Sequence, residues 1–542
     1  MHPDYFRLFG VPAELSLLTI EEKIAYVNML KRLFMLEGPL ATTFANSLST
    51  DPAFDSSEPA QQTFLHCIAR ANQALPMRAD ILDILQKIAP DEQRARHLEI
   101  LNKLALPSAL DGKTHKSDLR EKESDAAYSA LLDILAKNPA HAGAADGLLR
   151  LDYTLGREPS AWLDRFHCPN RLTDLWRSAL FLHYARRGRR EEALPLWEQI
   201  PEKIRTPYLR VYAADNYILA RDRASGVKAY ASALRQDPSL HPVSLRLDAL
   251  LSPPALRTEL LREKKTAVCL YSWNKGAVLE QTLRALAKTD TGDSPVFVLL
   301  NGCTDDSLPR AEALRELFPE RRYEIVTLPV NIGAPAARNW LIRLPEVRAC
   351  EYVAFMDDDV LMPQDWLVRY LTEMEKDPRT GVVGCKVVFP PQGEDAPVMQ
   401  YIFRNVNMLM ARRGLLKLTI AEPAQGMRDT GLYSFTRRCL SVMGCLHLLR
   451  TSALEDAGDF DIRFSPSQVD DIDHDLCLAL KGWNIVYCGE VTCEHHQNSG
   501  IGTNSGARLS HASIGSILGN DVKLNFKHEA ALSALAQLAA GL

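Results

Sequence analysis

Three consecutive aspartates follow a short apolar run near the middle of the chain. Residues Tyr352 to Met356 carry no charge, and Asp357-Asp358-Asp359 come directly after them. Carboxylates at the end of a buried strand repel one another unless a cation or hydrogen-bond donors offset their charge. Alternate residues of an extended segment share a face, so Asp357 and Asp359 can reach one ligand while Asp358 points away. The triplet therefore predicts a divalent-cation site.

The elements around the triplet alternate between strands and helices from Lys264 onward. Short apolar runs are followed by amphipathic helical patterns, which is typical of βαβ units and predicts a mainly parallel sheet with ligands beyond the carboxyl ends of its strands. The expected strand and helix pairs are Thr266–Leu270 with Ala277–Leu286, Val296–Leu300 with Leu308–Leu317, Tyr323–Leu328 with Ala334–Leu344, and Tyr352–Met356 with Gln364–Met374.

The region before Lys264 is expected to be helical and contains a repeated pattern. The segment that begins at Tyr184 is echoed about 33 residues later by the one at Tyr217, and Trp197 is matched by Tyr230. Helix, small-residue turn, helix and a closing proline at this period resemble tetratricopeptide repeats, which stack into a groove that holds a polypeptide. A plain helical bundle is the alternative interpretation.

Composition places the chain among ordinary globular proteins. The 542 residues are 46% hydrophobic and 24% charged, with a formal net charge of −5, so no basic field attracts nucleic acid. Eleven cysteines without a CxxC pair favour a reducing cytosol. Neither a signal peptide nor a membrane helix is expected, which predicts a cytoplasmic protein. The expected parts are a helical domain at 1–110, repeats at 111–255, an α/β domain at 256–510 and a helical tail at 511–542.

Six stretches in order resemble the family 2 glycosyltransferases of GT-A fold. The resemblance covers about 240 residues and implies an α/β catalytic domain with a Rossmann-like, mainly parallel mixed sheet. It is carried by Thr266–Leu283, Val298–Ser307, Asn331–Asn339, Tyr352–Trp366, Gly444–Phe464 and Gln468–Trp483. A glycine- and serine-rich segment at 498–510 has the composition of a mobile lid.

The resemblance assigns the nucleotide to the ends of the first strands. Leu300 stands where the family often has an aspartate that bonds the base, so a preference for uracil is not implied. Arg338 has an alternative role in packing at the sheet edge, and the glycine turn after Asn301 has an alternative role as a simple capped turn. The residues expected on the nucleotide side are Ser272, Asn274, Asn301, Asp305, Arg338, Asp357 and Asp358.

The metal site implied by the resemblance is the DxD pair with a later histidine. Asp359 is the expected ligand, with Asp357 facing ribose or the metal. His495 or His496 is expected to add a further ligand, with His495 favoured, and imidazole suits Mn²⁺ better than Mg²⁺. An isolated histidine pair also fits a structural role. The expected cofactor is Mn²⁺ or Mg²⁺, with a nucleotide-diphosphate sugar as donor.

The acceptor side of the resemblance contains the expected general base. Asp471 corresponds to the base and Asp470 lies at its side, while a shifted register would give the role to Asp473. Crowding among these carboxylates is expected to raise the proton affinity of Asp471. Cys477 occupies the place of an arginine that the family has after this motif, so that part of the pattern is absent.

The resulting hypothesis is an inverting, metal-dependent glycosyltransferase. Its expected acceptor is a Ser or Thr hydroxyl of a protein held by the helical repeats. A polysaccharide or lipid-linked glycan acceptor is one alternative. Another is a non-catalytic peptide-binding scaffold with a degenerate transferase domain, against which the intact aspartates argue. A sugar-nucleotide pyrophosphorylase is disfavoured because Tyr271–Gly276 is not a glycine-rich loop.

Overall fold

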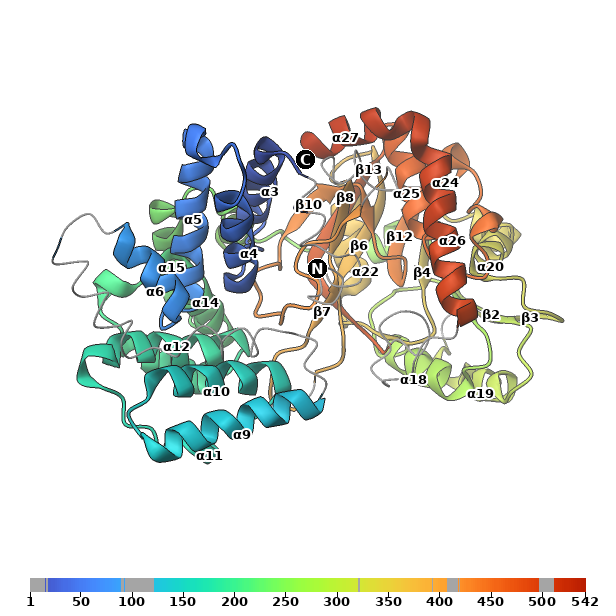
Figure 1. The fold of residues 1–542 in the computed structure, drawn as a ribbon. Helices are drawn as coiled ribbons and strands as arrows, with labels where there is room; N and C mark the ends of the chain where they lie inside the picture. Colours follow the sequence, from blue (N-terminus) through green and yellow to red (C-terminus); the bar gives the residue numbers. More distant parts are fainter. Residues whose placement is uncertain are drawn as a thin grey trace. The chain divides into compact units, whose positions relative to one another are not determined.

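The chain folds into two compact units (Figure 1). The first comprises Met1–Leu251 with two later segments, Gly393–Ala396 and Arg428–Leu432; the second comprises Ser252–Gln392, Pro397–Met427 and Tyr433–Leu542. The computed structural model describes residues 15, 18–88, 92, 121–319, 322–391, 393–406, 418, 420–496 and 511–542. The segment 498–510, where a lid was expected, lies outside these residues.

The first unit is helical, as the sequence predicted. Its first helix begins with a reciprocal cap, because the Thr19 side chain accepts from the backbone of Glu22 while the Glu22 carboxylate accepts from the Thr19 backbone. The helices described are α3 (Ile20–Arg32), α4 (Gly38–Ser49), η1 (Phe54–Ser56), α5 (Glu58–Ala74), α6 (Ala79–Lys87), α9 (Glu121–Lys137), α10 (Ala142–Leu155), α11 (Ser160–Leu163), η2 (Asn170–Leu172), α12 (Thr173–Arg186), α13 (Arg190–Gln199), η3 (Glu202–Ile204), α14 (Pro207–Leu219), α15 (Arg223–Gln236) and α16 (His241–Leu251).

The repeated pattern corresponds to two successive helix pairs. Helix α12 packs against α13, and α14 packs against α15. Trp197 of α13 and Tyr230 of α15, the matched aromatic residues, are both buried. The turns between the paired helices contain residues with positive φ, Gly188 and Arg221. These pairs match the predicted helical architecture, and the tetratricopeptide character of the region stays a prediction.

The second unit is built on a 10-stranded sheet and a 3-stranded sheet. The path through the large sheet is β10-β13-β6-β12-β4-β1-β2-β3, with β5 paired to β13 and β7 paired to β6; the small sheet has the order β11-β8-β9. The strands are β1 (Thr266–Ser272), β2 (Val296–Asn301), β3 (Tyr323–Leu328), β4 (Tyr352–Met356), β5 (Val360–Leu361), β6 (Thr380–Val388), β7 (Met399–Tyr401), β8 (Phe403–Val406), β9 (Ile420–Ala421), β10 (Thr436–Cys439), β11 (Ser441–Val442), β12 (Leu446–Arg450) and β13 (Asn484–His495).

Helices cover this sheet and complete its core. Helix α20 packs against β1 and β2, α22 against β6 and β13, α24 against β12, and α25 against β13. The helices are α17 (Leu260–Glu263), α18 (Gly276–Leu286), α19 (Ser307–Ala313), η4 (Arg315–Leu317), α20 (Ala334–Ile342), α21 (Pro345–Arg348), α22 (Trp366–Met374), α24 (Thr451–Ala457), η5 (Ile462–Phe464), α25 (Asp470–Leu480), α26 (His511–His528), η6 (Glu529–Ala531) and α27 (Leu532–Ala540).

The sheet is mixed, and its parallel part is the part that the sequence predicted. Strands β1, β2, β3 and β4 pair in parallel, as the strand–helix alternation requires. Strand β12 lies antiparallel between β4 and β6, and β6 returns to a parallel pairing with β13. This arrangement fits the mixed α/β sheet expected of the domain.

None of the described helices is both long and apolar enough to cross a membrane.

Candidate active site

Two carboxylates and one imidazole converge where β4 and β13 end. Asp357 and Asp359 come directly after β4, and His495 is the last residue of β13. His495 Nε2 lies 3.1 Å from Asp359 Oδ1 and 4.0 Å from Asp357 Oδ2. One ligand atom from each of the three side chains lies within 4.8 Å of the other two. The alternation predicted from the sequence thus places both outer aspartates on one face, toward a single histidine.

The histidine is held by a residue that the sequence did not reveal. Gln400 Oε1 on β7 lies 3.1 Å from His495 Nδ1 and accepts from that nitrogen, which directs Nε2 toward the aspartates. The backbone N–H of His496 donates to the Asp359 carbonyl at 2.8 Å, while its imidazole faces Glu494 at 3.9 Å. Of the two adjacent histidines, only His495 directs its ring toward the carboxylates.

The middle aspartate of the triplet points away from this group. Ser272 Oγ donates to Asp358 Oδ2 at 2.6 Å, and Asp358 is buried. Lys275 Nζ lies 3.0 Å from Asp358 Oδ1 and 3.0 Å from Asp359 Oδ2, so the ammonium group bridges both carboxylates. Lys275 follows β1. The sequence alone does not indicate this contact, because Lys275 is not part of a recognisable motif. The pairing of β1 with β4 brings it to the triplet.

Burial and neighbouring charges set different pKa values for the three aspartates. Burial raises the pKa of Asp357, although the Arg338 guanidinium partly opposes the shift. Burial also raises the pKa of Asp358 to about 6. Burial opposes ionisation of Asp359 as well, but the hydrogen bond and charge of His495 and the charge of Lys275 outweigh it and lower the Asp359 pKa. Asp359 is therefore the carboxylate that stays ionised most readily.

Arg338 connects this group to the acidic start of α25. Its Nη1 pairs with Asp470 Oδ2, its Nη2 donates to the Gly444 carbonyl at 3.3 Å, and the same Nη2 lies 3.9 Å from Asp357 Oδ1. The guanidinium carbon lies 5.3 Å from the centroid of the Tyr271 ring, whose hydroxyl donates to Asp357 Oδ1 at 3.1 Å. A buried arginine between the buried carboxylate of Asp470 and the half-buried carboxylate of Asp357 is consistent with a site for an anionic ligand.

Asp471 is held by donors on both of its oxygens. Its Oδ2 accepts from the Gly444 backbone N–H at 2.9 Å and lies 3.2 Å from Arg404 Nη1, and its Oδ1 accepts from the Ile472 N–H at 2.9 Å. Burial opposes ionisation, but the Arg404 and Arg338 guanidinium groups and these amides lower the pKa of Asp471. The expectation that crowding raises its proton affinity is wrong. Burial instead raises the pKa of its neighbour, Asp470.

Asp473, the alternative base, is engaged elsewhere. Its Oδ1 lies 2.8 Å from His528 Nε2 and its Oδ2 lies 2.6 Å from Lys527 Nζ, and it is 2% exposed. Both partners come from the end of α26 in the C-terminal part of the chain. Asp471 instead shares Gly444 with Arg338, the arginine that lies beside Asp357, and this favours the register that places the base at Asp471.

The other residues expected on the nucleotide side organise the two loops at the ends of β1 and β2. Asn274, in a left-handed conformation, accepts from the Thr304 N–H at 2.7 Å. Asn301 Oδ1 accepts from the Ile332 N–H at 2.9 Å, which fixes the turn before α20. Asp305 accepts from Gly276 at 3.0 Å and from Ser307. Their side chains stabilise the two loops through hydrogen bonds to backbone N–H groups. This is also what the alternative interpretation, a simple capped turn after Asn301, predicts.

The donor set formed by Asp357, Asp359 and His495 fits a divalent cation. Carboxylate oxygens are preferred by Mg²⁺ and Mn²⁺, and an imidazole adds affinity for Mn²⁺. Gln400 supplies the orienting hydrogen bond that metal-ligating histidines usually have. Lys275 lies beside Asp359 and Arg338 lies beside Asp357, and both offset the carboxylate charge. The residues present are therefore chemically suited to a metal with an anionic ligand.

Three comparisons with known proteins bear on this site. Residues 264–506 match the family described as "Glycosyltransferase like family 2". The chain is 24% identical over 208 residues to the "O-antigen biosynthesis protein RfbC" of Myxococcus xanthus, which covers 38% of this chain and 15% of that protein. It is 27% identical over 182 residues to "Probable glucomannan 4-beta-mannosyltransferase 3" of Oryza sativa subsp. japonica, which covers 34% of this chain and 29% of that protein.

The chain also matches a solved structure at low sequence identity. The mannosyltransferase PcManGT from Pyrobaculum calidifontis, in complex with GDP-Man and Mn²⁺, is 18% identical with a TM-score of 0.33, covering 58% of this chain and 85% of that one. The chain spans less than a third of the length of either curated relative named above. The matched segment contains every candidate residue of the site, from Ser272 to His496. Residues 264–506 therefore form a glycosyltransferase family 2-like domain.

Proposed function

We propose that the second unit transfers a sugar from a nucleotide-diphosphate sugar to an acceptor hydroxyl in a metal-dependent reaction. The observation that carries the proposal is the convergence of Asp357, Asp359 and His495 beside the buried pair of Arg338 and Asp470. This group lies beyond the carboxyl end of a parallel strand, where α/β sheets collect ligands. The family match over residues 264–506 supports the same reaction class.

Asp357, Asp359 and His495 would hold Mn²⁺ or Mg²⁺, with Gln400 orienting the imidazole. Such an ion, when bound, stabilises the new negative charge on the diphosphate leaving group. Lys275 contributes a fixed positive charge between Asp358 and Asp359, and Ser272 holds Asp358 in place. Arg338, which is buried, provides a second cation close to Asp357. We assign these residues to the diphosphate end of the donor.

We assign the remaining predicted residues to positioning of the nucleotide. Asn274, Asn301 and Asp305 brace the loops after β1 and β2 through backbone hydrogen bonds. Their role in donor binding is therefore to fix the loop shape as well as to contact the nucleotide. Leu300, at the position where an aspartate often bonds the base, is buried. The Leu300 side chain therefore forms no hydrogen bond with the base.

Asp471 is the proposed general base. Its lowered pKa keeps the carboxylate ionised at neutral pH, so that it can accept the proton of an acceptor hydroxyl. The hydroxyl oxygen then attacks the sugar C1 from the face opposite the diphosphate, which inverts the configuration. Asp471 is 9% exposed and Asp470 only 3% exposed, so Asp471 is the more accessible of the two. Asp470 keeps its pairing with Arg338 and holds that guanidinium in place.

The acceptor class is proposed from the relatives. Both curated relatives have names that refer to polysaccharide synthesis, one to O-antigen and one to glucomannan. We therefore put a saccharide hydroxyl first among acceptors and a nucleotide-activated mannose first among donors. A Ser or Thr hydroxyl of a protein is the second candidate, because the sequence predicts tetratricopeptide-like pairs in the first unit and such pairs stack into peptide-binding grooves.

The proposal is tested with the full chain and a panel of nucleotide sugars. We expect turnover of one donor in the presence of Mn²⁺ and its loss with a chelator. The matched variants His495→Ala and His496→Ala separate the two rings. His495→Ala is expected to raise the Mn²⁺ concentration required for half-maximal activity by about 10–100-fold or to abolish activity, whereas His496→Ala retains the wild-type requirement.

Product masses then identify the acceptor class. Transfer to an added oligosaccharide raises its mass by one hexosyl unit, while a glycosylated co-expressed protein gains the same increment in its intact mass. If no nucleotide sugar is hydrolysed and calorimetry detects no binding, the catalytic proposal is wrong and the non-catalytic scaffold is the better interpretation. Equal effects of the two histidine substitutions would contradict the assigned metal ligand.

A further inference from the structure

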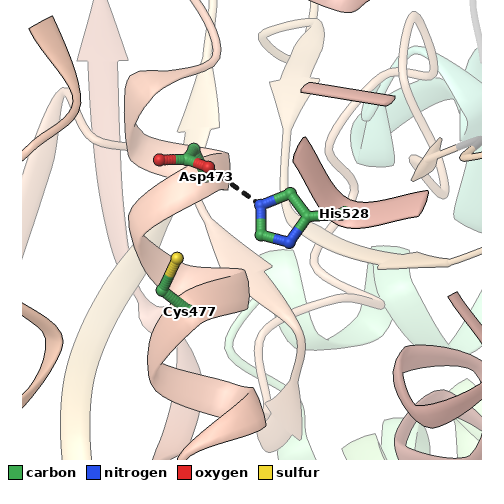
Figure 2. A group of neighbouring side chains, drawn as sticks. All are labelled: Asp473, Cys477 and His528. Carbon is green, nitrogen blue, oxygen red and sulfur yellow. Dashed lines mark hydrogen bonds and ion pairs between the residues drawn. The ribbon is translucent and has the colours of Figure 1, made fainter. Parts of the chain in front are cut away.

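A second group of metal-ligating side chains lies between α25 and the end of α26. Asp473 and Cys477 are four residues apart on α25, so they lie on one face of that helix, one turn apart. His528, the last residue of α26, faces both of them (Figure 2). One ligand atom from each of Asp473, Cys477 and His528 lies within 4.8 Å of the other two.

The carboxylate of Asp473 divides its two oxygens between different partners. Oδ1 lies 2.8 Å from His528 Nε2, on the side of the histidine and the thiol. Oδ2 lies 2.6 Å from Lys527 Nζ, which also lies 2.9 Å from Asp461 Oδ2. The ammonium group thus holds the carboxylate from its outer side and leaves Oδ1 directed into the group. Ligating carboxylates are commonly fixed by such an outer hydrogen bond.

The charges around the group are balanced before a metal ion binds. Asp473 and Asp461 carry two negative charges, which Lys527 and Arg463, the ion-pair partner of Asp461, offset. A divalent ion adds two positive charges to the group. Cys477 binds a metal as its thiolate and therefore releases one proton to solvent when the ion binds. The local charge after binding is therefore one positive unit higher than before. The Cys477 side chain is half-buried.

The donor set is that of a zinc site. Sulfur, imidazole nitrogen and carboxylate oxygen are all zinc ligands, with bond lengths of about 2.0–2.3 Å that place ligand atoms of a tetrahedral site within about 4 Å of one another. We propose that Asp473, Cys477 and His528 bind one Zn²⁺, with water as fourth ligand on the side of the partly exposed thiol. The ion joins α26 to α25, the helix that begins with Asp470 and Asp471.

The test uses the full chain, freed of metal with a chelator and titrated with Co²⁺ as a spectroscopic substitute for Zn²⁺. We expect a thiolate-to-Co²⁺ charge-transfer band whose final intensity corresponds to one thiolate-bound Co²⁺ per chain, together with the intense visible bands of tetrahedral Co²⁺. Added Zn²⁺ should remove both. The group at Asp357, Asp359 and His495 has no sulfur ligand, so the charge-transfer band reports only the new site, and His495→Ala should leave it unchanged.

Cys477→Ser is expected to abolish the charge-transfer band, and His528→Gln to weaken Co²⁺ binding at this site. Cys168→Ser, at another half-buried thiol in the first unit, is the matched control and should retain the band. The proposal is overturned if the wild-type chain takes up Co²⁺ without a thiolate band, or if the band persists in Cys477→Ser. The wild-type titration decides the matter even where a variant fails to fold.

Discussion

The buried carboxylates on α25 differ in proton affinity because their partners differ. Asp471 accepts hydrogen bonds from two backbone N–H groups and faces the Arg404 guanidinium. These contacts lower the pKa of Asp471. Asp475 lies one helical turn further on, and burial raises its pKa to about 8, although the Val442 N–H donates to it at 3.1 Å. At neutral pH one side chain is a carboxylate and the other is mainly a neutral acid. Neighbouring aspartates on one helix therefore have different chemical uses.

This contrast gives a matched pair of substitutions. Asp471→Asn removes the only proposed proton acceptor and is expected to lower kcat by about 10²–10⁴-fold, with donor affinity retained. Asp475→Asn replaces a mainly neutral acid by a neutral amide of similar shape and is expected to change kcat little. Steady-state kinetics and calorimetric titration of the donor check both. Full activity of Asp471→Asn would exclude that residue as the base.

Gly444 is required by its closeness to the base. A Cβ atom at this position would lie 2.9 Å from the Asp471 Cβ and 3.1 Å from Arg338 Nη2. Gly444→Ala must therefore displace either the base or the arginine, and we expect a loss of kcat of at least about 10-fold, since small misplacements of reacting groups are costly. Gly515→Ala, on α26 with open space around the added methyl group, is the control. Unchanged kcat in Gly444→Ala would contradict the assigned geometry.

The sequence predicted the residues of the site whose positions follow from a local pattern. Strand alternation placed Asp357 and Asp359 on one face and Asp358 on the other, and the structure confirms this. Lys275 and Gln400 were not predicted, because each reaches the site through pairing with a strand distant in the sequence. A lone lysine or glutamine has no spacing that reveals such a partner. The lowered pKa of Asp471 was missed for the same reason, since Arg404 comes from β8.

At the scale of elements, the strand–helix repeat was predictable, and so was a strand at Ile485–Cys488 within β13, but most of the remaining sheet was not. β3 and β4 have the predicted limits, and β1 and β2 extend one or two residues beyond them. β6 and β12 were not predicted, although all nine residues of β6 are buried. A continuous buried strand has no alternation of polar and apolar residues, and the antiparallel direction of β12 has no local signal. Tertiary pairing alone determines both.

Helices α14 and α15 share a buried carboxyl group that makes the stability of the first unit depend on pH. Asp215 of α14 accepts hydrogen bonds from the hydroxyls of Tyr230 and Thr430, and burial raises its pKa to about 7. Its unfolded value is about 3.9. A raised pKa means that its contribution to stability is complete below about pH 4 and is lost as the pH rises to about 7.

The expected loss over this interval is up to about 4 kcal/mol, because each pKa unit corresponds to about 1.4 kcal/mol. Asp215→Asn stays neutral throughout and should remove this part of the slope. Hydrogen exchange of the α14 and α15 amides between pH 4 and pH 8, corrected for the intrinsic exchange rate, gives the free energy of opening for both proteins. Parallel pH profiles for wild type and variant would contradict the assignment.

At the scale of the whole molecule, the chain does not divide at a single linker. It leaves the second unit for the first at Gly393–Ala396 and again at Arg428–Leu432, and returns each time. Within the first unit, Arg187 donates to both oxygens of buried Asp395 at 2.7 and 2.9 Å, and Arg428 lies 2.9 Å from the same carboxylate. Removal of residues 1–251 would leave these later segments without their partners. Loss of acceptor use in such a truncation would therefore not identify an acceptor groove.

A point substitution in the full chain tests this organisation more directly. Arg187→Met keeps the bulk of the side chain but leaves Asp395 with Arg428 as its remaining ion-pair partner, and breaking a buried pair costs about 3 kcal/mol or more. We expect faster hydrogen exchange in α12 and in 393–396, with the exchange of β1 and β4 in the second unit unchanged. Arg190→Met, at an exposed position on α13, is the matched control. If both variants exchange like the wild type, Arg187 does not anchor the later segment; if β1 and β4 also exchange faster, the two units unfold together.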